Sequence, residues 1–408
     1  MIKNRILIKD HHKELISSPD IQIVWLKAAV VAGLWASFEI IIGSLLHNIY
    51  LPFAGSILTA FAVCLLVAFS QLWKDKGLIW RAGLICALMK SVSPSAIILG
   101  PMTAIMLEGF LFNFSLSLFG YNWFGYLTGG ALCLLSALLH KIINLLILYG
   151  FNIIDIYINL FQFVTKQINM VNASFWMLLI VLSIVYALIG VFAASIGIVI
   201  GRKAQKLSSS IDIMTDLAQS KTGLFHVNQN EKFSLALLFS HLLIIPVCLY
   251  LLGNQSIYIS IPVILIYIIV CLVYYQNSLR KLKKTTFWIQ LFVITILAAF
   301  FWNGFSKSGN WFDINGLWVG VMMNIRALIV IIGFAAFSVE LRNPLIRLFL
   351  FNKGFRQLYL SISIAFEALP LMIASMDNSL VFFRNPLKSI SRTMLQAENW
   401  LIYFQNQK

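Results

Sequence analysis

Long, uninterrupted apolar runs recur along the whole chain. Two of them, residues 174–200 and 256–275, contain no Asp, Glu, Lys or Arg. About 20 apolar residues, each rising about 1.5 Å, cross the hydrocarbon core of a bilayer. Such runs must form helices, because lipid offers no partner to a backbone N–H or C=O group. The pattern therefore predicts membrane-spanning α-helices rather than a water-soluble core.

The apolar runs predict about ten membrane spans, six in the first half of the chain and four in the second. The six are expected at residues 22–46, 51–72, 79–99, 101–119, 123–150 and 174–200. The four are expected at residues 234–252, 256–275, 286–303 and 316–339. Residues 340–408 are more polar, and we expect amphipathic helices there rather than a further span. The predicted fold class is an all-α, polytopic membrane protein.

Composition and charge fit this interpretation. Of the 408 residues, 60% are hydrophobic and 11% are charged, whereas soluble domains carry about 25% charged residues. The lysines and arginines that give the net charge of +15 fall mostly on one side of the predicted spans; the other side receives only Lys90, Lys141, Lys166 and Lys307. Cytoplasmic loops favour Lys and Arg. We therefore expect a multi-pass protein of the cell membrane with both termini in the cytoplasm, and no nucleic-acid partner.

The longest polar stretch between spans, residues 202–232, divides the chain. It is rich in Ser, Asp, Gln and Asn, which is typical of a linker between two units. We expect a six-helix module over residues 1–201 and a second membrane module over residues 233–408, with amphipathic helices at about 340–404.

Charged side chains inside the predicted spans point to a binding site in the first module. Such residues are costly in lipid, so they indicate either a function or a buried partner. Glu39, Lys90 and Glu108 are of this kind, and two interpretations stay open for Glu39 and Lys90: a structural ion pair or part of the site. A pocket for a small solute needs an apolar lining with a few polar groups. The candidate solute-binding residues are Glu108, His47, Asn48, Glu39, Lys90, Ser93, Ser95 and Asn113.

Two of these assignments have plain alternatives. His47 fits an interfacial histidine better than a ligand, and Lys141, in the fifth span, can extend its ammonium group to the membrane surface. The five cysteines lie in apolar stretches, with no CxxC motif and no Cys/His cluster. Nothing in the sequence therefore predicts a metal site or a cofactor.

Residues 20–202 resemble the substrate-binding S component of energy-coupling factor (ECF) vitamin transporters. The resemblance lies in the six-helix layout, in LHNIYLPFAG after the first span and in GPMTAIMLEGF at the start of the fourth. It implies capture of a vitamin-like micronutrient from outside the cell. Members that carry cobalt or nickel resemble one another in a histidine at the extreme N-terminus. This chain begins Met1-Ile2-Lys3-Asn4, which argues against a metal substrate.

Residues 316–404 resemble the T component of the same transporters. The matching features are Arg326 in the last span, the segment from Glu340 to Pro344, and Glu367-Ala368-Leu369-Pro370 in an amphipathic helix. The resemblance implies that these helices couple to ATPase subunits. We expect the basic residues there to contact an ATPase: Arg342, Arg347, Arg356, Arg384 and Arg392. Where the family has Ala-Arg-Gly or Ala-Arg-Ser, this chain has Phe383-Arg384-Asn385-Pro386, so either the cognate ATPases are adapted to it or ATP coupling has been altered or lost.

The apolar positions of the C-terminal helices form one stripe. Such a stripe lies on a membrane or in the groove of a partner. Its members are Leu358, Ile362, Phe366, Leu369, Ile373, Met376 and Leu380.

The chain carries no P-loop, HExxH or GxSxG motif, so we do not expect an enzyme. Any ATP hydrolysis would belong to separate ABC ATPase subunits. The sequence thus predicts the membrane subunit of an ECF-type importer. Two alternatives stay open: a proton- or ion-coupled secondary carrier that uses Glu39, Glu108 and Lys90, and a non-transporting membrane scaffold.

Overall fold

The structure is a computed structural model, and helices make up its secondary structure throughout the part of the chain that it describes. The described residues are 21–48, 53–90, 99–168, 174–208, 234–254, 257–276, 279–302, 312–340, 355–375 and 386–406. The first half contains α2 (Ile23–Asn48), α3 (Ala54–Leu72), α4 (Leu78–Lys90), α5 (Leu99–Phe119), α6 (Trp123–Tyr149), α7 (Asn152–Gln167) and α8 (Phe175–Ser208). The second half contains α9 (Leu235–Asn254), α10 (Ile257–Tyr274), η1 (Arg280–Lys283), α11 (Thr285–Phe301), α12 (Ile314–Glu340), α14 (Arg356–Ser375) and α16 (Pro386–Asn406).

Most of these helices coincide with the predicted spans. Among the described residues, eight helices are long and apolar enough to cross a membrane, and α10 and α11 are shorter apolar helices. The all-α, multi-pass membrane fold is therefore confirmed, whereas the number of crossings stays a prediction. The predicted span 79–99 is described only in part, as α4, because residues 91–98 lie outside the described part of the chain.

Helix α2 lies at the centre of the first module. Of its apolar window, 83% is buried inside the protein, compared with 17% for α9. Helices α3, α4, α14 and α16 pack against it, and the shared core includes Trp35, Phe69 and Phe112. Because α2 is enclosed by protein rather than lipid, it can carry a charged side chain at membrane depth.

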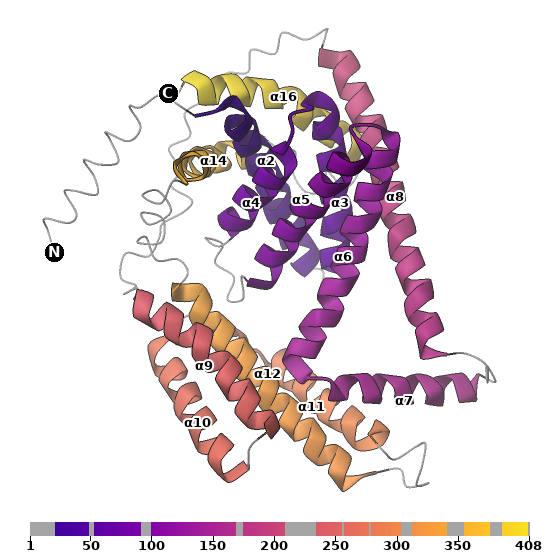
Figure 1. The fold of residues 1–408 in the computed structure, drawn as a ribbon, viewed down its shortest axis with the longest axis vertical. Helices are drawn as coiled ribbons and strands as arrows, with labels where there is room; N and C mark the ends of the chain where they lie inside the picture. Colours follow the sequence, from indigo (N-terminus) through magenta and orange to yellow (C-terminus); the bar gives the residue numbers. More distant parts are fainter. Residues whose placement is uncertain are drawn as a thin grey trace, which may run out of the picture.

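Helices α9 to α12 form a second, smaller bundle (Figure 1). Its core lies between α9, α10 and α12 and includes Ile245, Ile264 and Ile332. Pro246 and Pro262 lie inside α9 and α10, where neighbouring helices can satisfy the backbone groups that a proline frees.

Helix α7 was not among the elements predicted from the sequence. It lies crosswise to α6 and α8 (Figure 1) and packs on α11. Ile153 and Ile156 are buried in this contact, whereas Asp155 is exposed. The helix is therefore amphipathic, with its apolar stripe on the second bundle.

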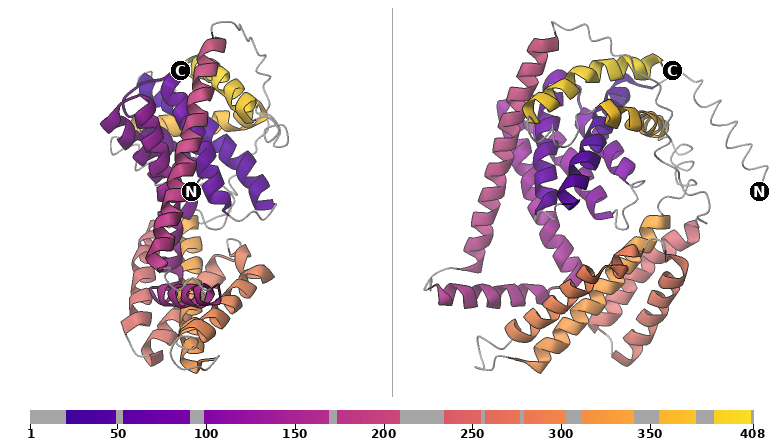
Figure 2. Two further views of the ribbon diagram at one scale, coloured as in Figure 1. Left: turned by 90° about the vertical axis from the view of Figure 1, so that its right-hand side faces the viewer. Right: turned by 180° about the vertical axis from the view of Figure 1, so that it is seen from behind.

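The C-terminal helices return to the first module. Figure 1 views α14 nearly end-on beside α2, and Figure 2 shows α16 crossing the end of the module where α8 ends. Leu358 and Leu369 of the predicted stripe are buried in the first module's core, and a Cβ at Gly33 would lie 2.6 Å from Met372 Sδ. The described members of the stripe are thus covered by the same chain, whereas Met376 and Leu380 lie outside the described residues. By length and composition α14 is also a candidate span, but it packs across α2.

A second joint links the two modules at the opposite end of α6. Arg326 Nε of α12 lies 3.4 Å from the carbonyl oxygen of Ile147, in the last turn of α6. Gly150 follows with φ 78°, and a Cβ there would lie 3.3 Å from the Arg326 guanidinium. Asn159 of α7 donates to the carbonyl of Phe301, at the end of α11. A cation beside the carbonyl end of a helix is favourable, because the helix dipole is negative there.

Candidate solute-binding site

Glu39 and Lys90 form an ion pair inside the first module. Lys90 Nζ, on α4, lies 3.5 Å from Glu39 Oε2, on α2, and their side chains are 19% and 9% exposed. The pairing that the sequence suggested is therefore present. Whether the pair also meets a solute stays a prediction.

Glu108 is buried on α5 without a cationic partner among the described residues. Its Oε1 accepts a hydrogen bond of 2.7 Å from the Thr59 hydroxyl of α3, while its Oε2 is buried with no hydrogen-bond partner. Glu39 is close enough to Glu108 to act on it electrostatically.

The glycines beside this carboxylate explain how it reaches the interior. Gly83 of α4 and Gly109 of α5 face each other, and a Cβ at Gly109 would lie 2.8 Å from the Cα of Gly83. Small residues of this kind let two helix backbones approach closely in a membrane. The close approach holds α5 against α4 one residue beyond Glu108.

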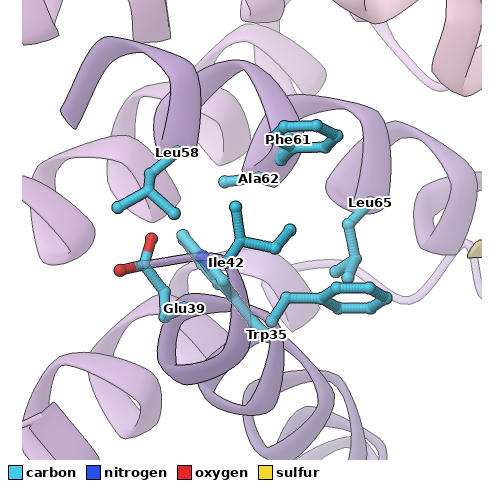
Figure 3. A pocket seen from close by; sticks show the side chains of 8 residues that line it. Trp35, Glu39, Ile42, Leu58, Phe61, Ala62 and Leu65 are labelled. Carbon is cyan, nitrogen blue, oxygen red and sulfur yellow. The ribbon is translucent and has the colours of Figure 1, made fainter. Parts of the chain in front are cut away.

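A narrow cleft opens between α2 and α3 next to Glu39. Figure 3 shows the Glu39 carboxylate beside Leu58, with Trp35 and Ile42 on the α2 side and Phe61 across the cleft. The space inside it is only about that of one water molecule, far below the roughly 300–1,000 Å³ of typical ligand pockets. The indole Nε1 of Trp35 is buried without a hydrogen-bond partner in the described structure. The cleft therefore combines an apolar wall, one carboxylate and one unused N–H donor.

The other predicted solute-binding residues are placed only in part. Asn113 is half-buried on α5, five residues beyond Glu108, so at about 100° per residue it lies on a different face of the helix. His47 and Asn48 end α2, but their side chains lie outside what the structure describes, as do Ser93 and Ser95 altogether. The structure thus brings together Glu39, Lys90 and Glu108.

Lys141 is held by hydroxyl groups. Its Nζ donates to Ser56 Oγ at 2.8 Å and to Tyr186 Oη at 3.1 Å, and it lies 4.5 Å from the centre of the Phe53 ring. These contacts tie α6 to α3 and α8. They replace the surface-directed orientation that the sequence left open.

The second module contains a buried polar network that sequence reasoning missed. His241 Nδ1 lies 3.1 Å from Tyr267 Oη, and its Nε2 lies 3.0 Å from Tyr275 Oη. Tyr275 donates to Glu340 Oε1 at 2.7 Å, and the Ser234 N–H donates to Glu340 Oε2 at 2.7 Å. The available signal was a histidine inside an apolar run together with tyrosines of the next span.

Of the predicted ATPase-contacting residues, Arg356 begins α14 and Arg392 is exposed on α16. Arg342, Arg347 and Arg384 lie outside the described residues. Within the described part of the chain, no group of three or more His, Cys, Asp or Glu residues is placed to hold a metal ion.

The fold and the buried charges define the class: a helical, multi-pass membrane protein with charged groups inside its first module. Comparison with known protein families, with curated proteins and with solved structures finds no match to this chain.

Proposed function

We propose that this protein is the membrane subunit of an importer for a small, vitamin-like solute, driven by separate ATPase subunits. The observation that carries the proposal is a set of ionisable side chains inside the first module: the buried Glu39 and Glu108 and the half-buried Lys90, with Glu39 also lining the α2–α3 cleft. Ionisable side chains at membrane depth are costly and are characteristic of transport pathways.

The C-terminal helices support the coupling part of the proposal. Helices α14 and α16 follow α12 of the second module, yet they pack on α2, α3, α4 and α8 of the first. A movement imposed on them from the cytoplasm would reach the helix that carries Glu39. The resemblance of residues 316–404 to the T component of ECF transporters assigns that movement to ATP binding by partner subunits.

We propose that the protein lies in the cell membrane. Both termini and the 202–232 linker then face the cytoplasm. Labelling of single-cysteine variants at Ser209 and Ser306 tests it. Ser209 should react only from inside and Ser306 only from outside; the reverse pattern contradicts the orientation.

The decisive experiment is purification of the full chain from its native membranes, followed by uptake measurements in vesicles. We expect an ABC ATPase to co-purify, and uptake to require ATP. Arg384→Glu should release the ATPase, because arginine holds carboxylates at two points and charge reversal replaces that contact with repulsion. Replacing Lys166, at the end of α7 and on the predicted outer side, by Glu is the control and should leave the ATPase bound.

One observation favours a second candidate, a proton-coupled carrier. Glu108 has no cationic partner among the described residues, and an unpaired buried carboxyl is a group that proton-driven carriers use. Uptake that follows a proton gradient in vesicles free of any ATPase would favour this candidate over the importer. A protein that neither binds a solute nor transports one would be a membrane scaffold.

A further inference from the structure

Lys141 is a cation without a counter-charge among the described residues. It lies within the apolar helix α6, a candidate membrane span, and its ammonium group contacts two hydroxyls and the faces of two aromatic rings. Both salt bridges between described residues involve other lysines. Ionisable groups at membrane depth usually pair with one another or mark the path of a solute. An anion from outside the chain would supply the partner that Lys141 lacks.

The polar groups around Lys141 carry more hydrogen-bond donors than they use. An ammonium group has three N–H donors, and each hydroxyl has one O–H donor. Lys141 Nζ donates to Ser56 Oγ at 2.8 Å and to Tyr186 Oη at 3.1 Å, and the two hydroxyls lie 3.2 Å apart, so that one donates to the other. One N–H and one O–H then have no acceptor among the described residues. A carboxylate offers two acceptor oxygens and one negative charge, which matches these donors and the lysine.

Phe53 covers the ammonium group from an exposed position. Its ring centre lies 4.5 Å from Lys141 Nζ, while its side chain is 65% exposed. Among the described residues it is the only non-glycine residue with a positive φ, 66°, and strained backbone of this kind gathers at ligand-binding segments. A Cβ at the next glycine, Gly55, would meet nothing within 4 Å. The start of α3 therefore borders open space, from which a ligand can reach Lys141 once the ring moves.

The Lys141 cluster lies next to the ionisable groups on which the proposed function rests. Ser56 precedes Thr59, the hydrogen-bond donor to Glu108, by three residues, and residues three apart share one face of a helix. The hydroxyl that contacts Lys141 and the hydroxyl that contacts Glu108 thus follow one another along α3. In the proposed orientation the Lys141 cluster is the one nearer the outside of the cell.

We infer that Lys141, Ser56 and Tyr186 bind the carboxylate group of the solute, which is a small organic monoanion. The inference rests on the proposed function, since it names the class of solute that the first module would capture. The carboxylate displaces the Phe53 ring, because a charged hydrogen bond is stronger than an exposed contact between a cation and a ring. The phosphodiester of a lipid headgroup shares this chemistry, since it also presents two oxygens and one negative charge.

Four probes separate these possibilities. Benzoate is an anion, benzamide is neutral and benzamidine is a cation on the same ring, while dimethyl phosphate represents the lipid headgroup. Binding to the full chain in lipid nanodiscs, measured by calorimetry, should be tightest for benzoate and undetectable for benzamidine. Failure of benzoate to bind at millimolar concentration, or equal binding of benzamide, overturns the inference. Tighter binding of dimethyl phosphate than of benzoate would assign the site to a lipid and also overturn it.

Two substitutions then locate the contacts. Lys141→Met keeps the length of the side chain and removes the charge, so the affinity for benzoate should fall about 10- to 150-fold. Tyr186→Phe removes a hydroxyl and no charge, so the affinity should fall about two- to tenfold, and it remains a test if Lys141→Met does not fold. The matched control is Lys166→Met, at an exposed position of α7, which should change nothing. An affinity for benzoate that either change at the site leaves unaltered contradicts the assignment.

The ATPase co-purified with each preparation separates this inference from the proposed function. Benzoate binding that depends on Lys141, in a preparation without any ATPase, would sustain the solute class and contradict the importer. A bound ATPase together with preference for benzamide or benzamidine would contradict the solute class alone.

Discussion

In the second module both oxygens of the Glu340 carboxylate accept hydrogen bonds, whereas in the first module Glu108 has one bonded oxygen and one without a partner in the described structure. Both side chains are buried, at 1% and 5% exposure. Burial alone therefore does not distinguish them; the completeness of their hydrogen bonding does.

The difference separates structural polar groups from binding groups. A fully satisfied buried network fixes the arrangement of the helices that contribute to it, and here it joins α9, α10 and α12. A buried group with unmade hydrogen bonds lowers the stability of the protein without ligand. Such groups are characteristic of functional sites, where stability is given up for activity. Glu340 should thus act on folding, and Glu108 on ligand binding.

The largest expected effect is that of Glu340→Ala. The change removes a carboxylate that accepts from the Ser234 N–H and from Tyr275. Two hydrogen bonds to a charged group are worth about 3–6 kcal/mol together, so Tm should fall by roughly 10 °C or more. Thermal unfolding in detergent, followed by tryptophan fluorescence, measures it. Ser338→Ala is the control, because the Ser338 hydroxyl is buried without a partner among the described residues; equal effects of the two changes would contradict the structural role.

Lys90→Met should have the next largest effect, because it leaves Glu39 buried without its cation. Breaking a buried pair from one side costs about 3–5 kcal/mol, and partial exposure of the lysine, 19%, lowers the expectation to about 2–3 kcal/mol. The double variant Glu39→Gln/Lys90→Met should recover most of this loss. If the stability losses of the two single variants simply add in the double variant, the 3.5 Å contact between Lys90 and Glu39 contributes nothing to stability.

Tyr267→Phe should have the smallest effect of the three. It removes one neutral hydrogen bond, to His241 Nδ1, which is worth about 1 kcal/mol or a Tm decrease of about 2–4 °C. Tyr258→Phe serves as the control, since Tyr258 is 89% exposed and should tolerate the change. A greater loss of stability in Tyr258→Phe than in Tyr267→Phe would contradict a stabilising role of the network around His241.

The sequence predicted the spans well because bilayer thickness fixes the length of an apolar run. It also singled out Glu39, Lys90 and Glu108, since the cost of a charge in lipid can be inferred from one residue and its neighbours. The sequence suggested the pairing of Glu39 with Lys90, but not the hydrogen bond from Thr59 to Glu108, which depends on how α3 and α5 pack.

Other features escaped for similar reasons. The network around His241 joins it to Tyr275, 34 positions away, and no local pattern encodes such a contact. The unused N–H of Trp35 follows from the packing of α2 against α3, which buries the indole beside the cleft. The stripe of α7 was present as Ile153 and Ile156 but lay between two long apolar runs. The C-terminal stripe was visible, whereas its position on α2 required the tertiary structure.

Glu108→Gln offers the most direct test of the contrast between the two carboxylates. The account predicts an unchanged or higher Tm, because a neutral amide removes an uncompensated buried charge, in contrast to the loss expected for Glu340→Ala. A clearly lower Tm would contradict it, and would make Glu108 a structural residue like Glu340.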